Sequence, residues 1–226
     1  ALGWRWQPRD WERAVSALLL KIARCSAALL GAAGLVGLYL EFYTELGLRG
    51  FVQFASYFTN LSNAGFVLAA LGLAVLPGCV TSSTWFVVAR GTVAISMVLT
   101  GLGYAALLRD TAGLFANPWI NHVLHAIMPL IALIDWLAFP PDAPQLRFAS
   151  SVWRWLLYPT VWVAYTFLHG WATGWYPYPF IDPNRSGGRD VVAVLAAMTA
   201  LLVVLVFLLV QYQRWRAAHA RDRADL

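Results

Sequence analysis

Six apolar runs of about twenty residues each are the feature that most constrains how this chain can fold. A helix of that length spans the hydrocarbon layer of a bilayer. The runs lie near residues 15–40, 54–76, 84–108, 119–139, 152–172 and 190–212. The composition agrees, since 60% of the residues are hydrophobic and 12% are charged. The sequence therefore predicts an all-α integral membrane protein, with residues 1–226 forming a single domain of six transmembrane helices.

Basic residues are distributed unevenly between the two ends of this predicted bundle. Of the 16 Lys and Arg side chains, 12 fall on the side that holds both termini and the second and fourth links, and 4 fall on the other side. Cytoplasmic segments of membrane proteins carry the excess of positive charge. We therefore expect both termini to be cytoplasmic. This asymmetry and contact with anionic lipid explain the net charge of +5, so we expect no nucleic-acid partner.

The fourth apolar run carries a narrow polar stripe. At 3.6 residues per turn, one face holds Asn121, His125, Met128, Ala132 and Asp135, and His122 lies off it. Polar groups on a membrane helix face protein or water, because lipid tails cannot satisfy them. We therefore expect His125 to point into the bundle as the first functional candidate. The alternative is a histidine that only forms hydrogen bonds between helices.

Polar side chains also gather in the second and fifth runs. The second run opens with a polar face made of Ser56, Thr59, Asn60 and Asn63. The fifth run carries an aromatic stripe made of Tyr158, Trp162, Tyr165 and His169. Hydrogen bonds between helices alone would also explain such groups. Because successive helices run in opposite directions, polar side chains from the second, third, fourth and fifth runs fall at one depth near the outer surface. These side chains are Thr59, Asn63, Tyr104, Asn121, His125, Tyr165 and His169. The sixth run has almost no polar content and is predicted to be a structural wall.

Further expectations follow from spacing and composition. Arg90 and Asp135 lie at similar depth near the cytoplasmic face and should form an ion pair. Three glycines spaced by three residues, Gly31, Gly34 and Gly37, allow close helix packing. The segment after the fifth run, WATGWYPYPFIDPNRSGG, is rich in aromatic residues and proline. We interpret it as a partial lid over an outer cavity, the alternative being an interfacial plug without a function.

The outer polar layer contains the parts of a nucleophile–base pair. A hydroxyl beside an imidazole can attack a carbonyl carbon while the imidazole takes its proton. We assign these roles to Thr59 and His125, with Asn60, Asn63 or Tyr165 as donors to the oxyanion. His169 is an alternative base. The layer holds no orienting carboxylate, so the arrangement is predicted to be a dyad.

Three segments of the sequence resemble a known family. They are YFTN at 57–60, NHVLH at 121–125 followed by PL at 129–130, and GWYPYPFID at 174–182. They resemble bacterial six-span membrane proteins over most of the chain. Over the second to fifth runs they also resemble the eukaryotic androgen-induced membrane proteins, which include the androgen-dependent regulator of tissue factor pathway inhibitor. The resemblance implies a bacterial inner-membrane protein that acts as a threonine hydrolase. The eukaryotic members cleave fatty acid esters of hydroxy fatty acids, and their catalytic residues correspond to Thr59 and His125. Ser56 and Ser62 are alternative nucleophiles.

The predicted function is hydrolysis of a membrane lipid or lipid-like ester by the dyad Thr59 and His125, with no cofactor and no metal. Residues expected around the substrate are Ser56, Asn60, Asn63, Tyr104, Asn121, His122, Tyr165, His169, Trp175 and Tyr178. Two other readings stay open. One is a lipid-binding or transport protein without catalysis. The other is a metal or haem protein that uses His122, His125 and His169 as ligands. The sequence leaves open the chain length of the substrate and the oligomeric state.

Overall fold

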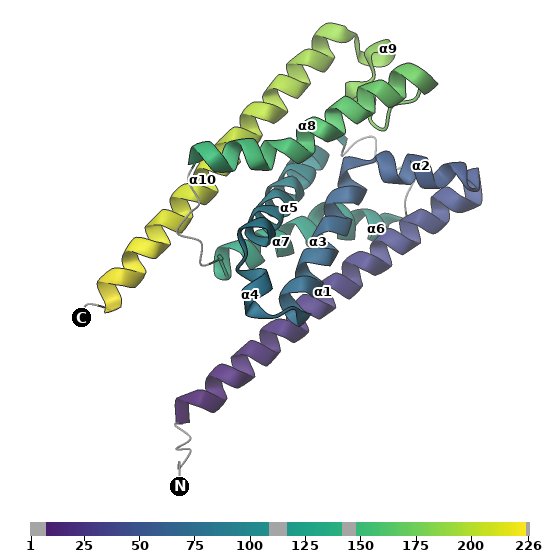
Figure 1. Cartoon of the computed structure of the whole chain (residues 1–226). Coiled ribbons are helices and arrows are strands. Elements are labelled where there is room, and N and C mark those ends of the chain that lie inside the picture. The colour runs from purple at the N-terminus through teal and green to yellow at the C-terminus, as the bar shows by residue number, and fades with distance from the viewer. Residues whose placement is uncertain (1–7, 109–116, 142–147, 225–226) are drawn as a thin grey trace.

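The structure, a computed structural model, describes residues 8–108, 117–141 and 148–224, and every regular element in those ranges is a helix (Figure 1). The long helices are α1 (Pro8–Leu46), α3 (Phe58–Val75), α5 (Thr84–Gly103), α8 (Phe148–Thr173) and α10 (Gly188–Ala224). Shorter helices are α2 (Arg49–Ser56), α4 (Gly78–Thr81), α6 (Pro118–His122), α7 (Met128–Ala138) and α9 (Pro183–Ser186). Two π turns, η1 (Tyr104–Leu108) and η3 (Val123–Ile127), and one 3₁₀ turn, η4 (Pro179–Ile181), complete the described elements.

Five helical stretches in the described part of the chain are long and apolar enough to cross a membrane. They are Trp11–Leu46, Phe58–Val75, Thr84–Leu108, Pro118–Ala138 and Gly188–His219. The prediction of an all-helical integral membrane protein is confirmed to this extent. The fifth predicted run forms helix α8, which is 26 residues long but less apolar than the others. Its interior carries Arg154, Pro159 and His169, which lower its mean hydropathy.

The second predicted span is interrupted near its start. Tyr57 adopts an extended conformation (φ −77°, ψ 126°) that separates α2 from α3. Backbone groups released by such a break need other partners. The Asn60 Nδ2 donates to the Phe54 carbonyl at 2.8 Å, and the Trp162 Nε1 donates to the Ser56 carbonyl at 2.9 Å. Polar residues of the predicted face therefore stabilise the break between the helices.

The fourth predicted span bends through a π turn. The Met128 amide donates to the carbonyl of Val123, five residues back, where an α-helix would connect residues four apart. Pro129 follows and has no N–H to donate to the carbonyl of His125. The proline therefore accounts for the change of hydrogen-bond register in the turn that holds His125.

The glycines of α1 allow close packing against the fourth span, as predicted. A Cβ atom on Gly34 would lie 3.1 Å from the Leu124 Cδ2, and one on Gly37 would lie 2.9 Å from the Ile120 Cδ1. Larger side chains at these positions would have to displace the neighbouring leucine and isoleucine. This contact holds the segment with His122 and His125 firmly beside α1 and α3.

Asp135 joins three helices by accepting hydrogen bonds from two arginines. The Arg90 Nη2 lies 2.8 Å from Asp135 Oδ2, which confirms the predicted pair. The Arg24 Nε lies 2.9 Å from Asp135 Oδ1, a contact that we did not predict. Arg90 also donates to the Phe139 carbonyl at 2.7 Å. The carboxylate thus compensates two charges that are largely shielded from solvent, and it connects α1, α5 and α7.

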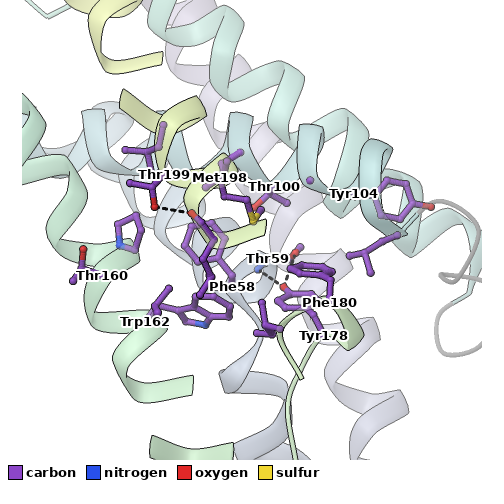
Figure 2. Close-up of a pocket in the computed structure, with 18 of the residues that line it drawn as sticks. Phe58, Thr59, Thr100, Tyr104, Thr160, Trp162, Tyr178, Phe180, Met198 and Thr199 are labelled. Atoms are coloured by element: carbon purple, nitrogen blue, oxygen red, sulfur yellow. Dashed lines mark hydrogen bonds between the residues drawn. The ribbon is translucent and has the colours of Figure 1, made fainter. Parts of the chain in front are cut away.

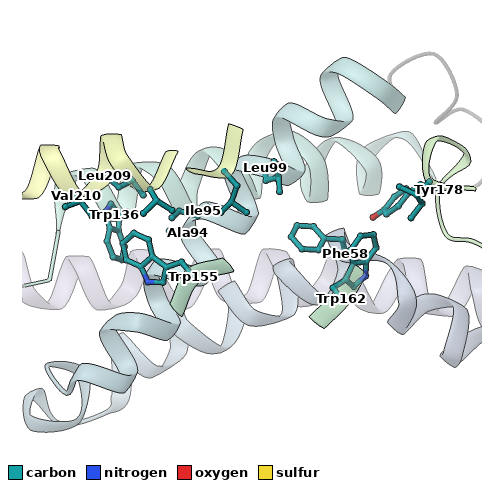
Figure 3. Close-up of a cluster of buried hydrophobic side chains, with 13 residues drawn as sticks. Phe58, Ala94, Ile95, Leu99, Trp136, Trp155, Trp162, Tyr178, Leu209 and Val210 are labelled. Atoms are coloured by element: carbon teal, nitrogen blue, oxygen red, sulfur yellow. The ribbon is translucent and has the colours of Figure 1, made fainter. Parts of the chain in front are cut away.

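The buried tryptophans of the described residues lie in one core cluster. Figure 3 shows Trp136 and Trp155 beside Leu209 and Val210, and Phe58, Trp162 and Tyr178 farther along the bundle. Trp136 and Trp155 pack edge to face with their ring centroids 5.9 Å apart. This cluster packs α8 and α10 against α3, α5 and α7, and it forms the walls around the site described next.

We predict that Asp135→Asn destabilises the protein by about 3–5 kcal/mol, because it leaves two arginines without their anionic partner in a shielded site. Chemical unfolding in detergent micelles measures this loss. The exposed Asp190→Asn is the matched control and should unfold like the wild type. Neutralising Arg90 together with Asp135 should recover only part of the loss, because Arg24 still lacks a partner. Wild-type stability of Asp135→Asn would contradict the role of this cluster.

Candidate functional site

A cavity of about 320 Å³ lies between α3, α5, α8 and α10 and is bordered by the link that follows α8 (Figure 2). Most of its lining is apolar. The polar exceptions are Thr59, Thr100, Tyr104, Thr160, Tyr178 and Thr199. All described residues that line the cavity are uncharged, and none is a histidine. The cavity therefore suits an apolar chain with few polar atoms.

Thr59 lies in the first turn of α3, at the cavity wall. Its Oγ1 is 3.2 Å from the Tyr178 Oη, and its backbone N–H donates to the same oxygen at 3.2 Å (Figure 2). Both residues are buried, with exposed fractions of 5% and 6%. Burial raises the pKa of Tyr178, and the hydrogen bond from Thr59 opposes this shift only in part. The tyrosine therefore keeps its proton at neutral pH and can donate it in a hydrogen bond.

His125 lies in the π turn η3, next to the cavity wall formed by Tyr104. The His125 and Tyr104 rings are stacked with their centroids 4.4 Å apart. The His125 Nδ1 is 3.1 Å from the carbonyl oxygen of Asn121, and the Asn121 Nδ2 donates to the Tyr104 Oη at 2.7 Å. The side chain is half-buried whereas His122 is exposed, which confirms the predicted orientation of the polar stripe.

One amide connects the segments that carry Thr59 and His125. The Asn63 Nδ2 donates to the carbonyl of Thr59 at 2.9 Å and to the carbonyl of Leu124 at 3.0 Å. Among the described residues, the hydrogen bonds of the Thr59 side chain involve Tyr178, and those of the His125 ring involve Asn121. The two members of the predicted dyad thus lie on adjacent segments, and their direct pairing stays a prediction.

Other residues of the predicted polar groups lie outside the cavity lining. The Ser56 Oγ lies 2.7 Å from the Tyr165 Oη, and Asn60 and Asn63 bind backbone carbonyls. His169 stacks on Tyr165 with ring centroids 5.5 Å apart. The structure therefore brings three of the predicted residues into the cavity wall, namely Thr59, Tyr104 and Tyr178, with Asn121 and His125 directly behind Tyr104.

The aromatic link covers the cavity as predicted. Tyr178, Phe180 and Ile181 line it, and the Tyr178 ring packs edge to face on Tyr57 with centroids 5.3 Å apart. Trp175, also predicted to bind substrate, lies instead in a separate hollow of about 200 Å³ beside Glu41, Glu45 and Gln53.

Several wall residues were missed by reasoning from the sequence. Helix α10, predicted to be a structural wall, contributes Leu195, Met198, Thr199 and Leu202 to the cavity. Thr100 of α5 and Thr160 of α8 are further hydroxyls in the lining. The available signal was isolated threonines within long apolar runs, which are too common in membrane helices to indicate a site.

The hypothesis of a metal or haem protein gains no support from the geometry. The described ranges hold no group of three or more His, Cys, Asp or Glu residues placed to bind a metal ion. Comparisons of the chain with protein-family models, with curated proteins and with solved structures find no match. The residues of the cavity are therefore the basis for assigning a function.

We predict that Tyr178→Phe lowers stability by about 1–3 kcal/mol, because the buried Thr59 N–H loses its acceptor while the ring packing is kept. Unfolding in detergent measures the change. The matched control is Tyr176→Phe in the same link, since no hydrogen bond of the Tyr176 hydroxyl is found among the described residues, and it should leave stability unchanged. Equal effects of the two substitutions would show that the hydroxyl of Tyr178 does not hold the start of α3.

Proposed function

We propose that this protein is a six-span intramembrane hydrolase of lipid esters, with both termini in the cytoplasm and Thr59 as its nucleophile. The observation that carries the proposal is a buried threonine hydroxyl at the wall of an apolar, uncharged cavity. Such a cavity accepts an acyl chain, and the hydroxyl marks the point at which an ester group would stop.

The position of the helix ends supports six crossings. The start of α1 and the end of α10 lie toward the same end of the bundle (Figure 1). A chain that begins and ends on one side of a membrane crosses it an even number of times. Helix α8, with 26 residues, is the natural sixth span beside the five apolar stretches. Its polar stripe faces the helix break, where Tyr165 and Trp162 have partners.

The reaction follows the acyl-transfer scheme of a hydroxyl nucleophile. The Thr59 Oγ1 forms a bond to the ester carbonyl carbon, and its proton passes to a base. The bond between this carbon and the alcohol oxygen then breaks, and the alcohol leaves with that proton. Water attacks the acyl group on Thr59 in the second half of the reaction. The fatty acid is released, and the threonine hydroxyl is restored.

His125 is the base in this proposal. The carbonyl oxygen of Asn121 can only accept a hydrogen bond, so the Nδ1 of a neutral His125 carries the ring proton. The Nε2 is then free to accept a proton. The Tyr104 ring stacks on the imidazole, and the structure shows no direct hydrogen bond between the described atoms of Thr59 and His125. We therefore place one water molecule between the two side chains as the proton carrier.

Two donors beside Thr59 can stabilise the oxyanion. The Thr59 N–H and the Tyr178 O–H meet at the start of α3, where the helix dipole also favours negative charge. A substrate carbonyl oxygen that replaces the mutual hydrogen bond of these two groups would accept from both. In this proposal the role belongs to Tyr178 rather than to Asn60, Asn63 or Tyr165, because these three residues do not line the cavity.

A lipid-binding protein without catalysis is the second candidate. One observation favours it: the Thr59 hydroxyl is bonded to Tyr178, and the histidine nearest to the cavity lies behind Tyr104. The same cavity would hold a lipid chain in either case. Turnover separates the two functions, because a binding protein retains its lipid intact.

We predict that Thr59→Ala and His125→Ala each abolish release of fatty acid from a long-chain ester by the purified protein. Because the two side chains act in one step, the double variant should be little worse than either single variant. His122→Ala is the matched control, since this histidine is exposed and does not line the cavity. Unfolding measurements on the same samples establish that the variants fold. Full turnover by folded Thr59→Ala would exclude Thr59 as the nucleophile.

We predict that a fluorophosphonate with a long alkyl chain labels Thr59. The Thr59 Oγ1 would form a bond to phosphorus as fluoride leaves, and the probe would remain attached to the peptide that contains residue 59. Mass spectrometry of the digested protein locates the label. Thr59→Ala should lose it and His122→Ala should retain it. Labelling at Ser56 or Ser62 would assign the nucleophile to that serine instead of Thr59.

A further inference from the structure

Exposed lining residues mark a place where the cavity can reach the outside of the bundle, and here they lie on α8 and α10. Among the described residues that line it, the two with exposed side chains are Thr160 of α8 and Thr199 of α10. Figure 2 shows both threonines on one side of Phe58 and the pair Thr59 and Tyr178 on the other side. The same cavity thus extends from the two exposed threonines, past Phe58, to Thr59.

This opening lies far from the ends of both helices. Thr199 comes 11 residues after Gly188, the first residue of α10, and Thr160 comes 13 residues before Thr173, the last residue of α8. At 1.5 Å per residue these separations are roughly 16 and 20 Å, about half the thickness of a bilayer's hydrocarbon layer. The side chains around Thr160 are exposed and apolar, with exposed fractions of 64% for Leu157 and 57% for Val161. In the proposed six-span arrangement the opening faces lipid tails instead of headgroups.

The chemistry of the lining determines which molecules can enter the cavity by this route. Its residues are uncharged, and its polar groups are hydroxyls that hydrogen-bond to an ester without compensating a charge. A carboxylate, phosphate or ammonium group is strongly disfavoured at this depth unless a partner of opposite charge awaits it. A neutral ester dissolves in the hydrocarbon layer and can diffuse there to the opening.

We propose that the substrates of this protein are uncharged long-chain esters that enter sideways from the hydrocarbon layer between α8 and α10. Turnover of this substrate class rests on the proposed hydrolase function, whereas binding of these esters does not depend on that function. It differs from the fatty acid esters of hydroxy fatty acids that the family resemblance implies. Those esters carry a free carboxylate, and the described lining offers a carboxylate no cationic partner.

Binding to the Thr59→Ala variant in lipid nanodiscs tests the substrate class without turnover. The reporter is a wax ester with a pyrene at one end, and the competitors are an unlabelled wax ester and the same ester with a terminal carboxylate. We expect the neutral ester to displace the reporter at a concentration lower by about tenfold or more, because charge is disfavoured in the opening. Equal or stronger displacement by the carboxylate ester would overturn the proposed class. Failure of hydrolysis by the wild-type protein would overturn the proposed function and leave this result unchanged.

A bulky substitution tests the route. Thr199→Trp should fill the opening and slow reporter uptake by about tenfold or more, because an indole is far larger than a threonine side chain. Val192→Trp is the matched control, since Val192 is an exposed residue of α10 outside the lining, and its uptake should equal that of the parent protein. Unfolding midpoints of both variants verify folding, and Thr160→Trp offers the same obstruction from α8. Unchanged uptake in folded Thr199→Trp and Thr160→Trp would refute access between these helices.

Discussion

The break at Tyr57 is the constraint on which the cavity end of the bundle depends. An extended residue inside a membrane helix releases carbonyl and N–H groups, and lipid tails cannot satisfy them. Three side chains from three parts of the chain supply the missing partners. Asn60 binds the Phe54 carbonyl, Trp162 binds the Ser56 carbonyl, and Tyr178 accepts from the Thr59 N–H. The break therefore determines where α8 and the aromatic link must dock.

The same interactions explain why the proposed nucleophile lies where it does. Thr59 follows the break by two residues, so its backbone N–H lies in the first turn of α3, where N–H groups have no acceptor within the helix. That N–H needs an external acceptor, which brings a tyrosine hydroxyl next to the threonine side chain. A structural requirement thus assembles a hydroxyl, an N–H and a neutral phenol at one point. These are the groups that an acyl-transfer site uses, and an ester carbonyl could take the place of their mutual hydrogen bond.

Helix periodicity was sufficient for much of the fold and for part of the site. It predicted the helices and the inward face of His125. Depth in the predicted spans gave the pair of Arg90 and Asp135, and composition gave the position of the aromatic link beside the cavity. Periodicity could not predict the break at Tyr57, because no proline or glycine marks that position. It also could not predict that Arg24 would share Asp135, since that contact joins residues 111 positions apart. The convergence of Thr100, Thr160 and Thr199 on one cavity depends on helix rotation, which single hydroxyls in apolar runs do not reveal.

The two ends of the bundle are held in different ways, and this difference bears on how the site could work. At one end, Asp135 fixes α1, α5 and α7 through two arginines, a contact that is costly to open. Near the cavity, the π turn η1 follows α5 and the π turn η3 lies within the fourth span, and these turns carry the stacked rings of Tyr104 and His125. A π turn can return to α geometry by shifting one residue of register, which rotates the side chains it carries. Near the cavity the neighbouring segments are thus held by stacked rings and the hydrogen bond between Asn121 and Tyr104, whereas the other end is held by an ion cluster. Uncharged contacts of this kind cost less to separate than an ion pair shielded from solvent.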